Sequence, residues 1–167
     1  MKQKNKHIFV FGIFAVDLSF YVDKKVKPGE TIIAKSSNIG PGGKASNQAI
    51  SARKLGATTT LITRLGNDNF NSYANDIWRK EKLFTSAKID KNLPTGIAGI
   101  FIDDKTGENS VIVDPGASAH LCVDDFYSQK SKMKKGDIFL TQFEQSSDTT
   151  FAVLKEAREL GMITIFN

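Results

Sequence analysis

The sequence is poor in cysteine and histidine, and each shortage excludes a class of site. A single cysteine, Cys122, excludes an internal disulfide and suits a reducing cytoplasm. The two histidines, His7 and His120, lie in polar contexts without a paired acid, so we expect neither a metal site nor a catalytic histidine. With 167 residues, 40% hydrophobic and 25% charged, the chain is expected to form one soluble globular unit.

Long hydrophobic runs are also lacking. The N-terminus reads MKQKNKHIFVFGIFAVD, in which basic residues precede the apolar run Ile8–Val16, as in a signal peptide. Asp17 closes that run, however, and no small-x-small cleavage pattern follows it. The run is too short to cross a bilayer. We therefore predict a buried first strand and no membrane association.

The charge is mildly basic and unevenly placed. The sequence carries a formal net charge of +5, and the excess lies largely in Lys2–Lys6 and Lys130–Lys135. Neither lysine run is interleaved with aromatic residues, so we expect two solvated lysine-rich faces rather than a nucleic-acid surface.

Two kinds of segment alternate along the chain. Helical patterns are followed by short apolar β-prone runs, which is typical of an α/β fold with a largely parallel sheet. The predicted helices are 45–55, 70–83 and 148–160, and the predicted strands that accompany them are 58–63, 137–142 and 162–166. Other strands alternate apolar and polar residues and form two hairpins, 18–23 with 31–37 and 96–103 with 110–114. We expect these hairpins to form a small separate sheet.

A glycine-rich stretch, GPGGKASNQA at residues 40–49, opens one of the predicted helices. Such a backbone can bring N–H groups close to a nucleotide phosphate, a dinucleotide or a sugar hydroxyl. A phosphate-binding P-loop is excluded because Asn38 and Ala45 stand where that loop needs glycine and a hydroxyl. Gly40, Gly42 and Ala45, with Asp68 further on, match a dinucleotide fingerprint only weakly, because the preceding segment is polar.

The wider stretch GGKASNQAISARKLGATTTLITRLG resembles the N-terminal signature of the ribokinase (PfkB) family of carbohydrate kinases. The matching positions are Gly42, Gly43, Ala45, Asn47, Ala49, Gly56 and Gly66. Further matches are FGIFAVD, PGET, TGIA, PGAS and FLTQFE, so the resemblance spans nearly the whole chain. It implies the N-terminal portion of a ribokinase-like three-layer α/β core, with a β-sheet lid formed by residues 18–39 and 95–114.

The resemblance also implies roles at the sugar site. Asp17 would accept hydrogen bonds from sugar hydroxyls, Gly42 and Gly43 would let the backbone approach, and Lys44 and Asn47 would donate. Glu144 matches a family acid near the sugar, and Ala98 matches a lid residue that packs on it. The residues alone leave structural alternatives open: Asp17 could end a strand, Glu144 could be a loop acid, and Asn47 could be a surface amide.

Two departures from the family limit the prediction. Ribokinases commonly carry Asn at the position of Ala15, so the particular sugar stays open. The family's second signature is absent, and with it the catalytic base and the sites for ATP, Mg²⁺ and a monovalent cation, which we expect beyond residue 167. We therefore predict the sugar-binding half of a pentose kinase, inactive alone, cytoplasmic and homo-oligomeric. The alternatives are a non-catalytic sugar-binding or lid-mediated dimerisation module and, least favoured, an NAD(P)-dependent oxidoreductase.

Overall fold

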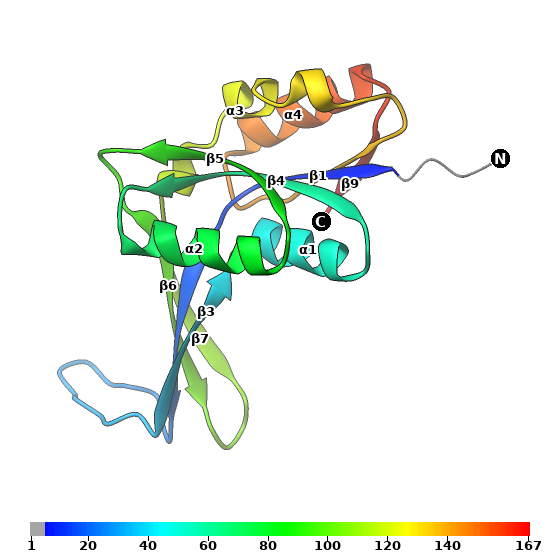
Figure 1. The fold of residues 1–167 in the computed structure, drawn as a ribbon. Helices are drawn as coiled ribbons and strands as arrows, with labels where there is room; N and C mark the ends of the chain where they lie inside the picture. The colour runs from blue at the N-terminus through cyan, green and yellow to red at the C-terminus, as the bar shows by residue number, and fades with distance from the viewer. Residues whose placement is uncertain (1–5) are drawn as a thin grey trace.

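The computed structural model describes residues 6–167, so most of the Lys2–Lys6 run lies outside the described residues. The described chain forms two β-sheets and four α-helices (Figure 1). One sheet is the centre of a layered core, and the other projects from it as an arm. None of the helices in residues 6–167 has the length and apolar character needed to span a membrane.

The core sheet has five strands in the order β5-β4-β1-β8-β9, and every neighbouring pair is parallel. Its strands are β1 (His7–Phe11), β4 (Thr58–Gly66), β5 (Phe84–Asp90), β8 (Ile138–Thr141) and β9 (Ile163–Phe166). The predicted α/β fold with a parallel sheet is therefore confirmed.

Helices cover both faces of this sheet (Figure 1). Helices α1 (Lys44–Lys54) and α2 (Asn69–Lys80) lie on one side, and α3 (Val123–Tyr127) and α4 (Ser147–Glu159) lie on the other. Successive residues of β1 serve the two faces in turn, because side chains alternate along a strand. Phe9 and Phe11 belong to the apolar cluster under α3 and α4, whereas Val10 belongs to the cluster under α1 and α2.

The arm is a four-stranded sheet in the order β3-β2-β6-β7. Its strands are β2 (Ala15–Val22), β3 (Ser36–Gly42), β6 (Thr95–Asp103) and β7 (Asn109–Gly116). The β2–β3 and β6–β7 pairs are antiparallel, and the two hairpins join through a parallel β2–β6 pairing. The predicted separate sheet is present; we call it the lid sheet below.

Several predicted elements need correction. The run Ile8–Val16 is not one strand, because the chain leaves the core sheet after Phe11 and enters the lid sheet at Ala15. Gly12 marks the change: a side chain there would overlap Gln142 and Ala45. Residues 31–35 form no strand, and the strand β5 and the short helix α3 were not predicted.

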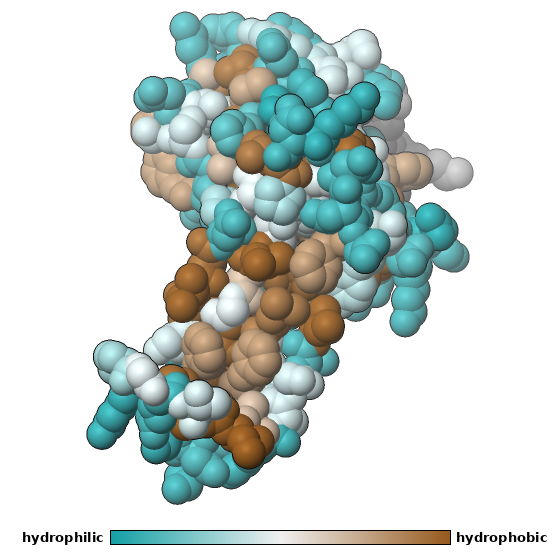
Figure 2. Space-filling model, turned by 90° about the vertical axis from the view of Figure 1, so that its left-hand side faces the viewer, coloured by the Kyte–Doolittle hydropathy of each residue, from teal (hydrophilic) through white to brown (hydrophobic). Residues whose placement is uncertain are grey.

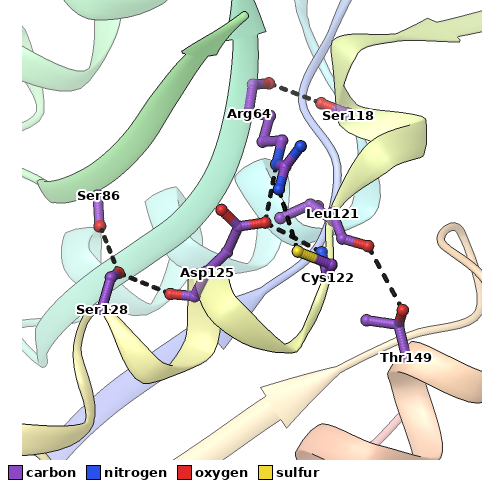
Figure 3. Close-up of polar contacts among 8 residues, drawn as sticks. All are labelled: Arg64, Ser86, Ser118, Leu121, Cys122, Asp125, Ser128 and Thr149. Carbon is purple, nitrogen blue, oxygen red and sulfur yellow. Dashed lines mark hydrogen bonds and ion pairs between the residues drawn. The ribbon is translucent and has the colours of Figure 1, made fainter.

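A buried ion pair fastens α3 to the core sheet (Figure 3). The Nε of Arg64, on β4, donates to Oδ2 of Asp125 on α3 at 2.8 Å, and the two side chains are only 11% and 5% exposed. A second guanidinium nitrogen of Arg64 donates to Sγ of Cys122 at 3.1 Å, while the Ser118 hydroxyl donates to the Arg64 carbonyl at 2.8 Å. These contacts hold residues 117–128, which follow the last lid strand, against β4.

Candidate functional site

The lid sheet places Asp17 next to two of the predicted site residues. On β2, Asp17 is in register with Ala98 of β6 and with Gly40 of β3. Its carboxylate lies against the α-carbon of Gly42, where a Cβ would overlap the carboxylate oxygens. Gly42 is therefore needed to leave room for Asp17, and a larger residue would displace that carboxylate.

Gly43 makes the sharp entry into helix α1. It is the N-cap of α1, with φ of 82°, and a Cβ there would overlap the backbone carbonyl of Ile13. A left-handed conformation with backbone on the facing side favours glycine alone. The GPGG stretch thus ends the lid strand β3 and starts α1 within two residues.

Glu144 supplies the charge that the start of α1 lacks. The first turn of α1 has no acidic residue and no side-chain cap. Glu144, which follows β8, accepts a hydrogen bond from the Lys44 backbone N–H at 2.7 Å and one from the Lys44 Nζ at 2.9 Å. A carboxylate at a helix N-terminus is favourable, so Glu144 offsets the unfavourable position of Lys44 in that first turn.

Asp17 and Glu144 are close enough to influence one another. The pKa of Asp17 is raised above its ordinary value, first by burial and then by the negative charge of Glu144. The site therefore joins two carboxylates and one ammonium group, drawn from β2, the β8 end and the α1 start. Hydroxyl groups both donate and accept hydrogen bonds, so this mixture of acceptors and donors suits a polyol.

The remaining predicted residues lie at the edges of this group. Ala98 is 4% exposed on the neighbouring lid strand, in register with Asp17. Asn47 is exposed on α1, and its backbone N–H bonds to the Gly43 carbonyl at 3.0 Å, so it lies one turn beyond Gly43. All seven predicted positions thus lie on the lid strands, the start of α1 or the end of β8.

A buried amide beside the site was missed by the sequence analysis. Gln142, at the end of β8, is fully buried, and its amide nitrogen donates to the side-chain oxygen of Gln48 on α1. Gln48 in turn donates to Asn167 Oδ1 at 3.2 Å, while the Gln142 Oε1 has no partner in the described structure. Gln142 stands two residues before Glu144 in the FLTQFE match. That match was the only sign in the sequence that Gln142 lies near the site.

The geometry does not support the dinucleotide alternative. Gly40 and Gly42 lie within the lid strand β3 rather than in a turn after a core strand. Asp68 is the N-cap of α2 and accepts from Asn71 N at 3.1 Å, Thr95 N at 2.6 Å and Thr95 Oγ1 at 2.8 Å. Burial alone would raise the Asp68 pKa, but these hydrogen bonds outweigh it and hold that pKa below its ordinary value. Asp68 therefore has a structural role.

Comparisons with known proteins identify the family. Residues 5–165 match the model of the pfkB family carbohydrate kinases, so the chain belongs to that family. It is 36% identical to a ribokinase of Dictyostelium discoideum over 157 residues, which cover 92% of this chain and 48% of that protein. The chain thus spans about half the length of the curated relatives it matches.

Solved structures share the fold. A ribokinase from Giardia lamblia has a TM-score of 0.88 and 27% identity, covering 98% of this chain and 51% of its own. An Arabidopsis thaliana ribokinase, solved in complex with ribose and ATP, has a TM-score of 0.78 and 26% identity, covering 98% of this chain and 53% of its own. The ribokinase-like fold is therefore established for residues 6–167.

The family implies ATP and Mg²⁺, and the described residues can be tested for a place to hold them. Within residues 6–167, no three histidine, cysteine or carboxylate side chains gather as a metal-binding group. The glycine-rich segment borders Asp17 and Glu144, whose charge would repel a phosphate chain. These residues do not fit a nucleotide site, so we assign ATP and Mg²⁺ no position on them.

Proposed function

We propose that this chain forms the sugar-binding half of a ribokinase-type sugar kinase, with a pentose such as ribose as its substrate. The observation that supports this most is the convergence of Asp17, Lys44 and Glu144 around glycines that the geometry requires. The proposal places the nucleotide, Mg²⁺ and monovalent-cation sites outside the described residues 6–167. The single cysteine suits a cytoplasmic enzyme of this kind.

In this proposal each side chain has a simple task. The Asp17 carboxylate accepts hydrogen bonds from two sugar hydroxyls, and the Asn47 amide donates to a third. Lys44 and Glu144 form an ion pair in which the Lys44 side chain is 60% exposed, so its ammonium can turn to a sugar oxygen while Glu144 still caps α1. Ala98 offers a small apolar surface on the lid side of the sugar.

A second candidate is a non-catalytic sugar-binding or lid-mediated dimerisation module. It is favoured by the apolar side chains that the lid sheet leaves exposed, and by the half-length match to the relatives. The sugar-binding candidates require a sugar site at Asp17, and the dimerisation candidate requires a lid surface that associates. These two requirements can be tested separately.

Replacing Asp17 with Asn should weaken ribose binding by about tenfold or more, because a hydrogen bond to a charged group is worth roughly 1.5–3 kcal/mol. Titration calorimetry on the wild type and on Asp17→Asn measures this directly. Asp76→Asn is a matched control, since Asp76 lies exposed on α2 and its one ion pair among residues 6–167 is with Arg79. Equal affinity in all three proteins would contradict a sugar-binding role for Asp17.

The raised pKa of Asp17 gives two further expectations for the same variant. Because the folded chain disfavours the ionised form, Asp17 opposes folding once it is charged, and Asp17→Asn should not lower stability at neutral pH. Ribose binding needs the ionised form, so affinity should fall on acidification, starting at a higher pH than for an ordinary aspartate. Loss of stability in Asp17→Asn would instead indicate a structural residue.

The chain should self-associate through exposed apolar surface. Figure 2 shows apolar side chains gathered over one face of the lid arm. Among the lid residues, Ile39 and Ile112 are 57% and 70% exposed, and Val111 and Val113 are 49% and 52% exposed. Strand β9 is at the edge of the core sheet, and its Ile163 and Ile165 are each 44% exposed. Among the described strands, only β8 pairs with β9, so the backbone N–H and C=O groups on the outer side of β9 have no partner strand. Exposed strand edges and apolar patches of this kind promote association.

We therefore expect a dimer or larger assembly in light scattering across a dilution series. Ile112→Lys tests the lid surface, and Ile163→Lys tests the β9 edge. The variant that restores a monomer locates the contact. A monodisperse wild-type monomer at micromolar concentration that melts cooperatively would contradict the expectation.

A further inference from the structure

Four lysines from two distant parts of the described chain meet at one place on the molecule. Strands β1 and β8 are parallel neighbours, with Ile8 in register with Ile138, so the amino ends of these two strands lie side by side. Lys6 precedes β1, and Lys132, Lys134 and Lys135 precede β8. These four lysines line one pocket of about 390 Å³, together with His7, Thr58, Gly136 and Asp137. The pocket is at the amino ends of the core strands, away from the carboxyl end of β8 where Glu144 lies.

The loop that carries three of these lysines is held in a fixed shape. Met133 anchors it in the core with 6% exposure. The Lys134 N–H donates to Asp137 Oδ2 at 3.0 Å, and Gly136, with φ of 86°, donates to the Gly161 carbonyl at 2.9 Å. Lys134 and Lys135 therefore belong to a short, hydrogen-bonded turn rather than to a long open loop. This lowers the entropic cost of ordering their side chains around a ligand.

The pocket has more positive than negative charge. Asp137 is the only carboxylate among the described residues that line it, and both of its oxygens accept backbone hydrogen bonds, from His7 N at 3.1 Å and from Lys134 N. Within residues 6–167, the side chains of Lys6, Lys134 and Lys135 form no ion pair. Lys132 Nζ donates to Gln129 Oε1 at 3.0 Å, which leaves its charge uncompensated.

We propose that this pocket binds a small oxyanion with two or more negative charges, such as a phosphate or diphosphate group. Four ammonium groups that form no ion pair among the described residues, the Thr58 hydroxyl and a cavity of this volume match such a group in charge and size. The proposal concerns a surface separate from the sugar site and does not depend on the proposed kinase function.

His7 is a built-in reporter for the pocket. Its ring stacks on Phe9 with centroids 4.2 Å apart, and its Nε2 lies 2.8 Å from the Thr60 hydroxyl. Burial lowers the His7 pKa most; Asp137 acts in the opposite direction, and Lys132 lowers the pKa further. The charged groups that line the pocket around it are Lys6, Lys132, Lys134, Lys135 and Asp137. A bound anion would favour the protonated ring and raise that pKa.

The test is an NMR titration of this chain with inorganic pyrophosphate at low ionic strength. The sequence contains two histidines, and His120 lies exposed on the turn after β7, so it serves as an internal control. We expect saturable shifts and a raised pKa at His7, with His120 unchanged. Lys134→Gln/Lys135→Gln should weaken pyrophosphate binding by about fivefold or more, as expected for two ion pairs near the surface.

A matched double variant, Lys88→Gln/Lys91→Gln, removes the same charge from exposed residues elsewhere and should change the affinity less than about twofold. Equal weakening by the two double variants, or equal shifts at both histidines, would overturn the proposal in favour of general charge attraction. Saturable binding of a single-stranded oligonucleotide at His7, with none of pyrophosphate, would overturn it in favour of a nucleic-acid surface.

Discussion

A polypeptide of this sequence should transfer no detectable phosphate from ATP to ribose, fructose or a nucleoside. Phosphoryl transfer depends on positioning and on stabilising charge at the transferred group. Its described residues bring together Asp17, Lys44 and Glu144, to which we assign the sugar, and the relatives it matches are about twice as long. A general base and an electrostatic clamp are each worth roughly 10²-fold or more in rate, and the proposed function assigns neither to these residues, so we expect no measurable turnover from them.

A coupled ADP-release assay checks this expectation, with a full-length ribokinase as the positive control. The variant Asp17→Asn separates true activity from a contaminating kinase, because only turnover by this chain should fall with it. ADP release that co-purifies with the chain, requires the sugar and is lost in Asp17→Asn would contradict the prediction. It would mean that this chain carries a phosphoryl-transfer site of its own.

The layered core could be predicted because local patterns and tertiary structure agree there. Helical segments such as Lys44–Lys54 alternate with β-prone runs such as Thr58–Gly66, and each buried strand is bounded by a glycine or a polar turn. Parallel pairing follows from that alternation, since each helix returns the chain to the same end of the sheet. The alternating hairpins also predicted the second sheet, and the family resemblance added its interpretation as a lid and the site residues.

The change of sheet at Gly12 could not be predicted from the apolar pattern. Phe11 and Ala15 are equally buried, although one lies in the core sheet and the other in the lid sheet. Hydropathy indicates that a residue is buried but not which strand it pairs with, so Ile8–Val16 looked like one continuous strand. Strand β5 was missed for the opposite reason: as an edge strand, with Phe84 59% exposed, it lacks a buried apolar run.

The site residues were predicted individually, but their contacts were not. The resemblance named Lys44 and Glu144 separately, 100 residues apart, and only the fold makes them an ion pair at a helix start. Gln142 likewise makes a long-range contact, since its amide donates to the side chain of Gln48, 94 residues earlier in the chain. Polar contacts between distant segments leave no periodic signal in a sequence.

Replacing Asp125 with Ala should cost about 3–5 kcal/mol of unfolding free energy, because Arg64 would be left buried without its counter-charge. Asp125 also accepts a hydrogen bond from the Cys122 N–H at 2.9 Å, which caps α3 (Figure 3). The loss should therefore loosen residues 117–128 and the lid strand β7 that precedes them. Denaturant unfolding at one fixed protein concentration measures the change, since self-association makes stability concentration-dependent.

A double-mutant cycle separates the ion pair from the packing around it. Arg64→Met removes the charge that Asp125→Ala leaves unpaired, so the double variant should be more stable than Asp125→Ala alone. The exposed pair between Arg79 and Asp76 is the control, and Asp76→Ala should change stability by only about 0.5 kcal/mol. If Asp125→Ala cost no more than Asp76→Ala, the segment would be held by Leu121 and Phe126, which are buried in the same apolar cluster. A large loss of unfolding free energy in Asp125→Ala that is partly recovered when Arg64 is also replaced would instead identify Arg64–Asp125 as the contact that fixes the lid's connection to the core.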